Sequence, residues 1–130
     1  MGIDYTTRSV SDWIEVLSNP DKEQRADATC ALIAYGEKSL PALLNVLTHT
    51  DWKVRYRAAE AVGQIGSMPD IDIVPTLIAL TEDEKDHVRY MAAKGLVKIG
   101  DPRAADVFQK LMHDEHSYTK DMAEKGLNNL

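Results

Sequence analysis

The sequence is poor in residues on which several classes of protein depend. It contains a single cysteine, Cys30, among 130 residues, so an internal disulfide and a thiolate zinc cage are both excluded. No apolar run approaches the roughly 18 residues that a membrane-spanning helix needs. Residues 1–7 lack the basic and apolar stretches of a secretory signal. We therefore expect a cytoplasmic protein with no membrane partner.

Basic residues are also in the minority. Lys and Arg total 15 against 21 Asp and Glu, which gives a formal net charge of −6 at pH 7. General nucleic-acid binding depends on neutralising phosphates with Lys and Arg, so we expect no nucleic-acid partner. Hydrophobic residues make up 44% of the chain and charged residues 28%. That balance favours a folded domain over a disordered segment, and the length fits a single domain.

What the sequence does contain is a repeat. Gly36, Gly66 and Gly100 each end a similar apolar-patterned stretch. The clearest copies are Val-Arg-Tyr-Arg-Ala-Ala, which begins at Val54, and Val-Arg-Tyr-Met-Ala-Ala, which begins at Val88. A period of 30 to 34 residues is typical of a stacked-repeat solenoid. We place the four repeats at about 9–36, 37–66, 67–100 and 101–130.

Each repeat contains two segments with helical periodicity. In the second copy, Val54, Ala58, Val62 and Ile65 recur at the spacing of one helix face. No alternating apolar run indicates a strand. We therefore predict an all-α fold, an α-solenoid of four helical hairpins. First helices are expected near 9–17, 38–48, 71–81 and 102–112, and second helices near 21–35, 52–65, 86–99 and 116–129.

The segment from Leu47 to Gly66 resembles a HEAT repeat of the short prokaryotic kind, also called the phycobilisome-lyase HEAT-like repeat. It has the apolar helix, the Asp-containing loop, the Val-Arg pair and the Ala-rich helix ending in Gly. The resemblance covers about residues 9–130. It implies an α-α superhelix with the second helices on the concave side. Because HEAT arrays serve many roles, it favours a fold more than any one function.

The same resemblance implies a polar ladder in which an Asp or Asn pairs with an Arg six residues later. His49 and Lys120 depart from that pattern, so we expect no regular ladder through the second copy. Arg55 and Arg89 should be partly buried near loop acids, with Asp83 as the partner of Arg89. The Arg positions are Arg25, Arg55, Arg89 and Lys120, and the positions six before them are Asn19, His49, Asp83 and Asp114.

Large and charged residues are expected in rows on the exposed side of the second helices, beside the alanines. Tyr, Arg and Met are enriched in the cores of interfaces, so we interpret this row as a docking strip for another protein or peptide. The alternative interpretation is a set of ordinary solvated positions. The predicted partner-binding residues are Asp27, Tyr56, Arg57, Glu60, Tyr90, Met91, Lys94 and Lys98.

The sequence indicates no catalysis, cofactor or metal. The run from His113 to His116 holds metal-binding residue types, but a zinc site needs three or four converging ligands. Cys30, in mid-helix beside Ala31, is interpreted as a small core residue. The leading prediction is a non-catalytic scaffold for protein–protein interaction. The alternative is an accessory subunit of an enzyme such as a bilin lyase-type complex.

A solenoid needs polar terminal faces to stay soluble. The last predicted helix is far more polar than the stretch from Val88 to Ile99, so we expect it to cap the array. We predict a monomer in dilute solution, with any self-association through the N-terminal hairpin. Size-exclusion chromatography with light scattering measures this. A stable dimer that survives polar substitution of Val10 and Trp13 would show that the exposed end is assigned wrongly.

Overall fold

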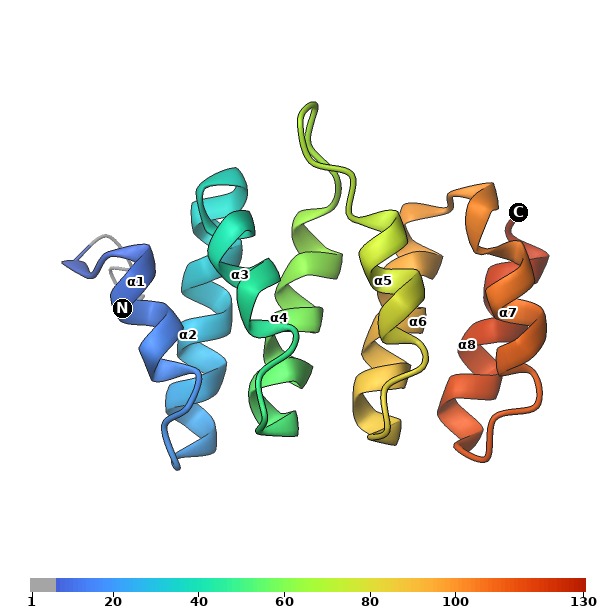
Figure 1. The fold of residues 1–130 in the computed structure, drawn as a ribbon, viewed down its shortest axis with the longest axis horizontal. Coiled ribbons are helices and arrows are strands. Elements are labelled where there is room, and N and C mark those ends of the chain that lie inside the picture. Colours follow the sequence, from blue (N-terminus) through green and yellow to red (C-terminus); the bar gives the residue numbers. More distant parts are fainter. Residues whose placement is uncertain (1–6) are drawn as a thin grey trace. The chain divides into compact units, whose positions relative to one another are not determined.

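The computed structural model describes residues 7–130, which form eight α-helices (Figure 1). Within this range the one β-type pairing is an isolated bridge between Met68 and Ile71. The prediction of an all-α chain is therefore confirmed.

The helices alternate between short and long in chain order. The short first helices are α1 (Val10–Val16), α3 (Leu40–Val46), α5 (Val74–Leu80) and α7 (Ala105–Leu111). The long second helices are α2 (Lys22–Tyr35), α4 (Trp52–Ile65), α6 (Asp86–Ile99) and α8 (Ser117–Asn128). Two 3-10 helices, η2 (Gly36–Ser39) and η3 (Pro102–Ala104), lead into α3 and α7. The predicted four hairpins are confirmed, with first helices slightly shorter than expected.

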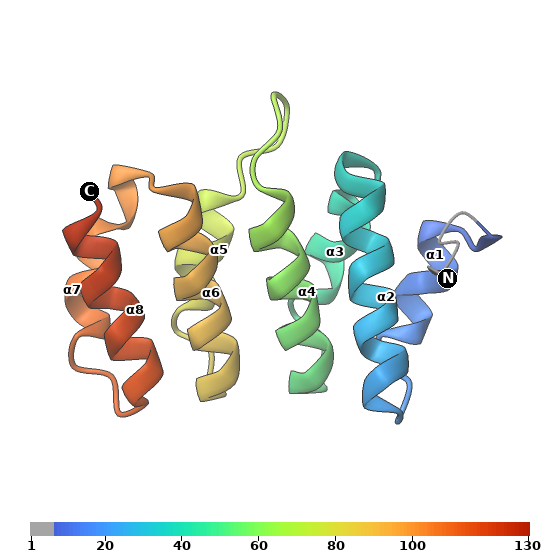
Figure 2. The ribbon, with the colours of Figure 1, turned by 180° about the vertical axis from the view of Figure 1, so that it is seen from behind.

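The chain divides into two compact units, Met1–Ile65 and Gly66–Leu130, called here the first and second unit. In the first unit, α1 and α3 lie on one side and α2 and α4 on the other (Figures 1 and 2). In the second unit, α5 and α7 lie opposite α6 and α8 in the same way. Each unit thus holds two of the four predicted repeats. That all four repeats form a single domain stays a prediction.

Small residues let the second helices of the first unit approach each other. Ala28 on α2 and Ala58 on α4 are fully buried, and these two helices pack together. Leu32 and Val62 fill the space beside them, also fully buried. Each such buried side chain contributes about 1.5–3 kcal/mol of hydrophobic free energy.

The expectation for Cys30 was wrong. Cys30 is exposed rather than part of the core. Because Ala28, Ala31 and Leu32 take the buried face of α2, the helical register turns position 30 outward. Trp13, in α1, is 4% exposed and lies in the core of the first hairpin.

The predicted helix-ending glycines have the backbone conformation that their positions require. Gly36, Gly66 and Gly100 all have positive φ, at 60°, 80° and 71°. Nothing lies within 4 Å of a Cβ built on any of them. Backbone conformation, not crowding, therefore requires glycine at these three positions.

Gly126 in α8 is needed for a different reason, because a Cβ there would lie 2.5 Å from Cε2 of the buried Phe108. A Gly to Ala change inside a helix ordinarily stabilises by about 0.5–1 kcal/mol. We expect Gly126→Ala instead to lower the free energy of unfolding by about 1–3 kcal/mol, through overpacking. Urea denaturation measures this.

Phe108→Leu supplies the matched test of the cause. It removes the ring atoms that the new methyl would meet, so the double variant should lose less stability than the sum of the two single losses. A Gly126→Ala protein as stable as the wild type would contradict the crowding argument.

Candidate docking surface

The loops that lead into α2, α4 and α6 share one arrangement. An arginine in the first turn of the helix donates through Nη1 to two successive main-chain carbonyls of the preceding loop. The first carbonyl lies six residues earlier, at 2.8 to 3.0 Å, and the next one lies at 2.8 to 3.2 Å. We call this arrangement the arginine clamp. Its arginines are Arg25, Arg55 and Arg89, and its first acceptors are the carbonyls of Asn19, His49 and Asp83.

The arginine clamp is present in the second repeat, although His49 was expected to interrupt the polar ladder there. The acceptor is a main-chain carbonyl, which every residue possesses, so the side chain at that position does not decide the bond. The side chain instead accepts from the main-chain N–H two residues later, as Nδ1 of His49 does from Asp51 at 3.0 Å. Oδ1 of Asn19, Asp83 and Asp114 does the same at 2.8 to 2.9 Å.

The partner expected for Arg89 also needs correction. Arg89 reaches Asp83 through the main-chain carbonyl, and its bidentate carboxylate partner is Asp114 from the loop before α8. Nε lies 2.9 Å from Oδ2, and Nη2 lies 3.2 Å from Oδ1. The two side chains are 19% and 9% exposed. This pair joins α6 to the last hairpin of the second unit.

Burial and hydrogen bonding act in opposite directions on the pKa of Asp114. Burial raises the pKa of Asp114, but the hydrogen bonds from Arg89 and from the His116 N–H outweigh it, so the net pKa lies below the ordinary value. The hydrogen bond to Asp114 in turn raises the pKa of the Arg89 guanidinium. Both groups are therefore held in their charged forms.

In the first unit, three of the predicted partner-binding residues lie together on α4. Nη1 of Arg57 is 3.0 Å from Oε1 of Glu60, with the two side chains 15% and 25% exposed. The Arg57 guanidinium also lies 5.5 Å from the ring centroid of Tyr56. The ring of Trp52 meets Tyr56 edge-on at 6.3 Å. Asp27, on α2, is half-buried.

In the second unit, the predicted partner-binding residues differ in how exposed they are. Lys94 and Lys98 on α6 are exposed, and Tyr90 is half-buried. Met91 is only 5% exposed, so its placement on the outer row was wrong. Val88, Ala92 and Met91 share the buried arc of α6, and this register turns the Met91 side chain into the core.

Four aromatic side chains that sequence reasoning did not connect meet in the second unit. His87 and Tyr90 come from the first turns of α6, and His116 and Tyr118 from the start of α8. The ring centroids of Tyr90, His116 and Tyr118 lie 5.7 to 6.3 Å apart in all three pairings. His87 lies 5.9 Å from His116. We call these four residues the ring cluster.

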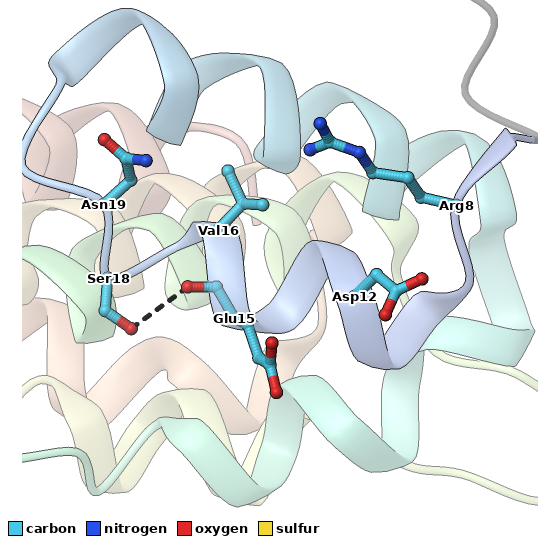
Figure 3. Close-up of a pocket in the computed structure, with 6 residues that line it drawn as sticks. All are labelled: Arg8, Asp12, Glu15, Val16, Ser18 and Asn19. Carbon is cyan, nitrogen blue, oxygen red and sulfur yellow. Dashed lines mark hydrogen bonds between the residues drawn. The ribbon is translucent and has the colours of Figure 1, made fainter.

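A surface hollow of about 390 Å³ runs along α1 in the first unit. Figure 3 shows Arg8 and Asp12 at one end and Ser18 and Asn19 at the other. Its polar atoms serve the local backbone, since Asp12 accepts from the Ser9 N–H and Ser18 donates to the Glu15 carbonyl. It therefore assembles no set of convergent reactive groups.

Two properties of residues 7–130 bear on function. No group of three or more His, Cys, Asp or Glu side chains in this range is placed to hold a metal ion. None of the helices there is both long enough and apolar enough to cross a membrane.

Removing the Arg89–Asp114 pair should destabilise the protein. We expect Arg89→Ala to lower the free energy of unfolding by about 1.5–3 kcal/mol, because it breaks charge-assisted bonds to a largely buried carboxylate. Lys94→Ala, at an exposed position of the same helix, should change it by less than about 0.5 kcal/mol. Urea denaturation compares the two, and equal losses would contradict a stabilising role for the pair.

The same pair makes a pH-dependent contribution. The folded-state pKa of Asp114 lies below its ordinary value of 3.8. The stabilisation is therefore fully present above that value and is lost as the pH falls through the folded-state pKa. The stability gap between wild type and Asp114→Asn should be the same at pH 7 and pH 6 and should shrink below about pH 3.8. A gap that persists unchanged at pH 3 would show that the charge of Asp114 is not its source.

Comparison with known proteins agrees with this architecture. The complex of CpcE and CpcF of phycocyanin lyase from Nostoc sp. PCC7120 has a TM-score of 0.80 at 23% identity, over 93% of this chain and 77% of that chain. An engineered protein has a TM-score of 0.65 at 25% identity, over 92% of this chain but only 61% of that one. Curated proteins gave no match. The model of HEAT repeats matches residues 10–73 and 40–128, and the chain belongs to the HEAT-repeat family.

Proposed function

We propose that this chain is a non-catalytic module that docks a partner protein or peptide on the side of its second helices that faces away from the first helices. HEAT repeats themselves suggest protein–protein interaction. The observation that carries the proposal is the arrangement on α4. Tyr56, Arg57 and Glu60 hold one another in place while remaining partly accessible.

A surface of this kind suits docking for a physical reason. Side chains that are already fixed lose little conformational entropy when a partner binds. Arg and Tyr also provide both apolar area and hydrogen-bonding groups, which is why interface cores are rich in them. In the second unit, α6 carries the half-buried Tyr90 and the exposed Lys94 and Lys98.

A second candidate is an accessory subunit of an enzyme of the bilin lyase type. The TM-score of 0.80 with the CpcE and CpcF complex favours it. At 23% identity that likeness concerns the fold, so the general docking role comes first. Phycobiliprotein genes beside the gene for this chain would favour the second candidate.

A pulldown from lysate of the source organism tests the docking role. We expect wild-type protein to recover specific partners, and Tyr56→Ala combined with Tyr90→Ala to recover at least about tenfold less, since truncating interface anchors typically costs more than 1 kcal/mol each. A matched control combines Asn45→Ala on α3 with Lys110→Ala on α7, both at exposed positions of first helices.

Circular dichroism melting must first show that both double variants are folded. Equal recovery of the same partners by wild type and by the Tyr56→Ala, Tyr90→Ala protein would overturn the proposal. Loss of partners in the control variant alone would instead assign docking to the first helices.

A further inference from the structure

The ring cluster presents a rigid aromatic surface in the second unit. Tyr90, His116 and Tyr118 form a closed triangle of ring contacts. The planes of these pairs are inclined by 60° to 63°, so the rings meet at an angle rather than in parallel stacks. Ring faces carry the negative end of the aromatic quadrupole. Tyr118 is 66% exposed, so this ring can offer a face to a ligand.

The core of the cluster is fixed by hydrogen bonds beneath it. Nδ1 of His116 lies 3.0 Å from Oγ1 of Thr119, which is fully buried. The main-chain N–H of His116 donates to Asp114 at 2.9 Å, and Asp114 is held by Arg89. His116 is therefore positioned before any ligand arrives, which lowers the entropic cost of binding.

The outer members of the cluster remain open to solvent. Tyr118 is 66% exposed, and the side chain of His87 is 51% exposed. A large aromatic side chain left in water forgoes the free energy of its burial. Grouped with three other rings, it forms an aromatic patch rather than a single exposed residue, and such patches mark interaction sites.

The surroundings of the cluster are acidic. Residues 82–89 and 113–121 hold seven Asp or Glu against three Lys or Arg, and Arg89 is already paired with Asp114. Asp86, whose side chain is 40% exposed, lies 2.7 Å from His87 at the edge of the cluster. Glu115, next to His116, is exposed. A cationic ligand therefore complements both the ring faces and the charge.

We propose that the ring cluster binds an arginine side chain in a basic segment of the partner protein. The guanidinium is planar, stacks on aromatic faces and keeps donors at its edge for carboxylates such as Asp86 and Glu115. A lysine ammonium satisfies the charge but cannot stack in this way. This inference rests on the proposed docking function and adds the chemistry of the partner.

The probe is a set of short peptides that differ only in their central residue, set among Gly and Ser. The central residue is arginine, lysine or citrulline, the neutral isostere of arginine. Titration into ¹⁵N-labelled full-length protein at low salt, followed by NMR, gives both affinity and location. We expect the arginine peptide to bind about tenfold more tightly than the citrulline peptide, with lysine between them, and to shift resonances of the ring cluster.

Variants at Tyr118 separate the ring from general charge attraction. Because Tyr118 is mostly exposed, its replacement should leave the fold intact. Tyr118→Ala should weaken arginine-peptide binding about threefold to tenfold, whereas Tyr118→Phe, which keeps the ring, should retain it. Met112→Ala, at an exposed apolar position directly after α7, is the matched control and should change nothing.

Several results would overturn the inference. They are equal affinity for the arginine and citrulline peptides, no shift at the cluster with millimolar arginine peptide, or unchanged affinity in Tyr118→Ala. Any of these would leave the docking function standing if partner recovery still depends on Tyr56 and Tyr90. Arginine-selective binding at the cluster, with partner recovery that ignores both tyrosines, would instead overturn the docking function.

Discussion

The arginine clamp is the interaction on which three of the four hairpins depend. Arg25, Arg55 and Arg89 each satisfy two loop carbonyls that would otherwise need other partners. The donor is a charged guanidinium, so these bonds are stronger than bonds between neutral groups, and they hold a loop that lacks regular structure. It also ties the first turn of the second helix to the loop that precedes it.

In the second unit the clamp extends directly to the ring cluster. The guanidinium of Arg89 uses Nη1 for the loop carbonyls and Nε with Nη2 for Asp114. Asp114 in turn accepts the N–H of His116, whose ring is bonded to Thr119. A single side chain thus connects the loop before α6, the loop before α8 and the aromatic surface. The packing of the hairpins and the placement of the ring cluster therefore depend on the same contacts.

The positions of the helices could be predicted from the sequence, but the burial of individual side chains on them could not always be. Helix positions followed from periodicity and from the glycines, because both are local signals. Met91 and Cys30 were misplaced because Ala-rich helices have a wide apolar arc, on which a shift of one residue changes burial. The clamp bond at His49 was missed because its acceptor is a main-chain carbonyl, which is the same whatever the residue type. The ring cluster joins residues of two repeats, and no local pattern links His87 to Tyr118.

The hydrogen bonds around Asp114 distinguish residues that the fold requires from residues that can be substituted. Asp114 and Thr119 are buried or nearly so, and each supports the position of another group, so their replacement disturbs the fold. Tyr118 and His87 contact the cluster from its solvent side, where substitution leaves the core intact. A module built in this way can change the partner chemistry at the exposed rings while its hairpins stay the same. That separation is what a docking scaffold requires, since affinity depends on the few exposed side chains and stability on the buried ones.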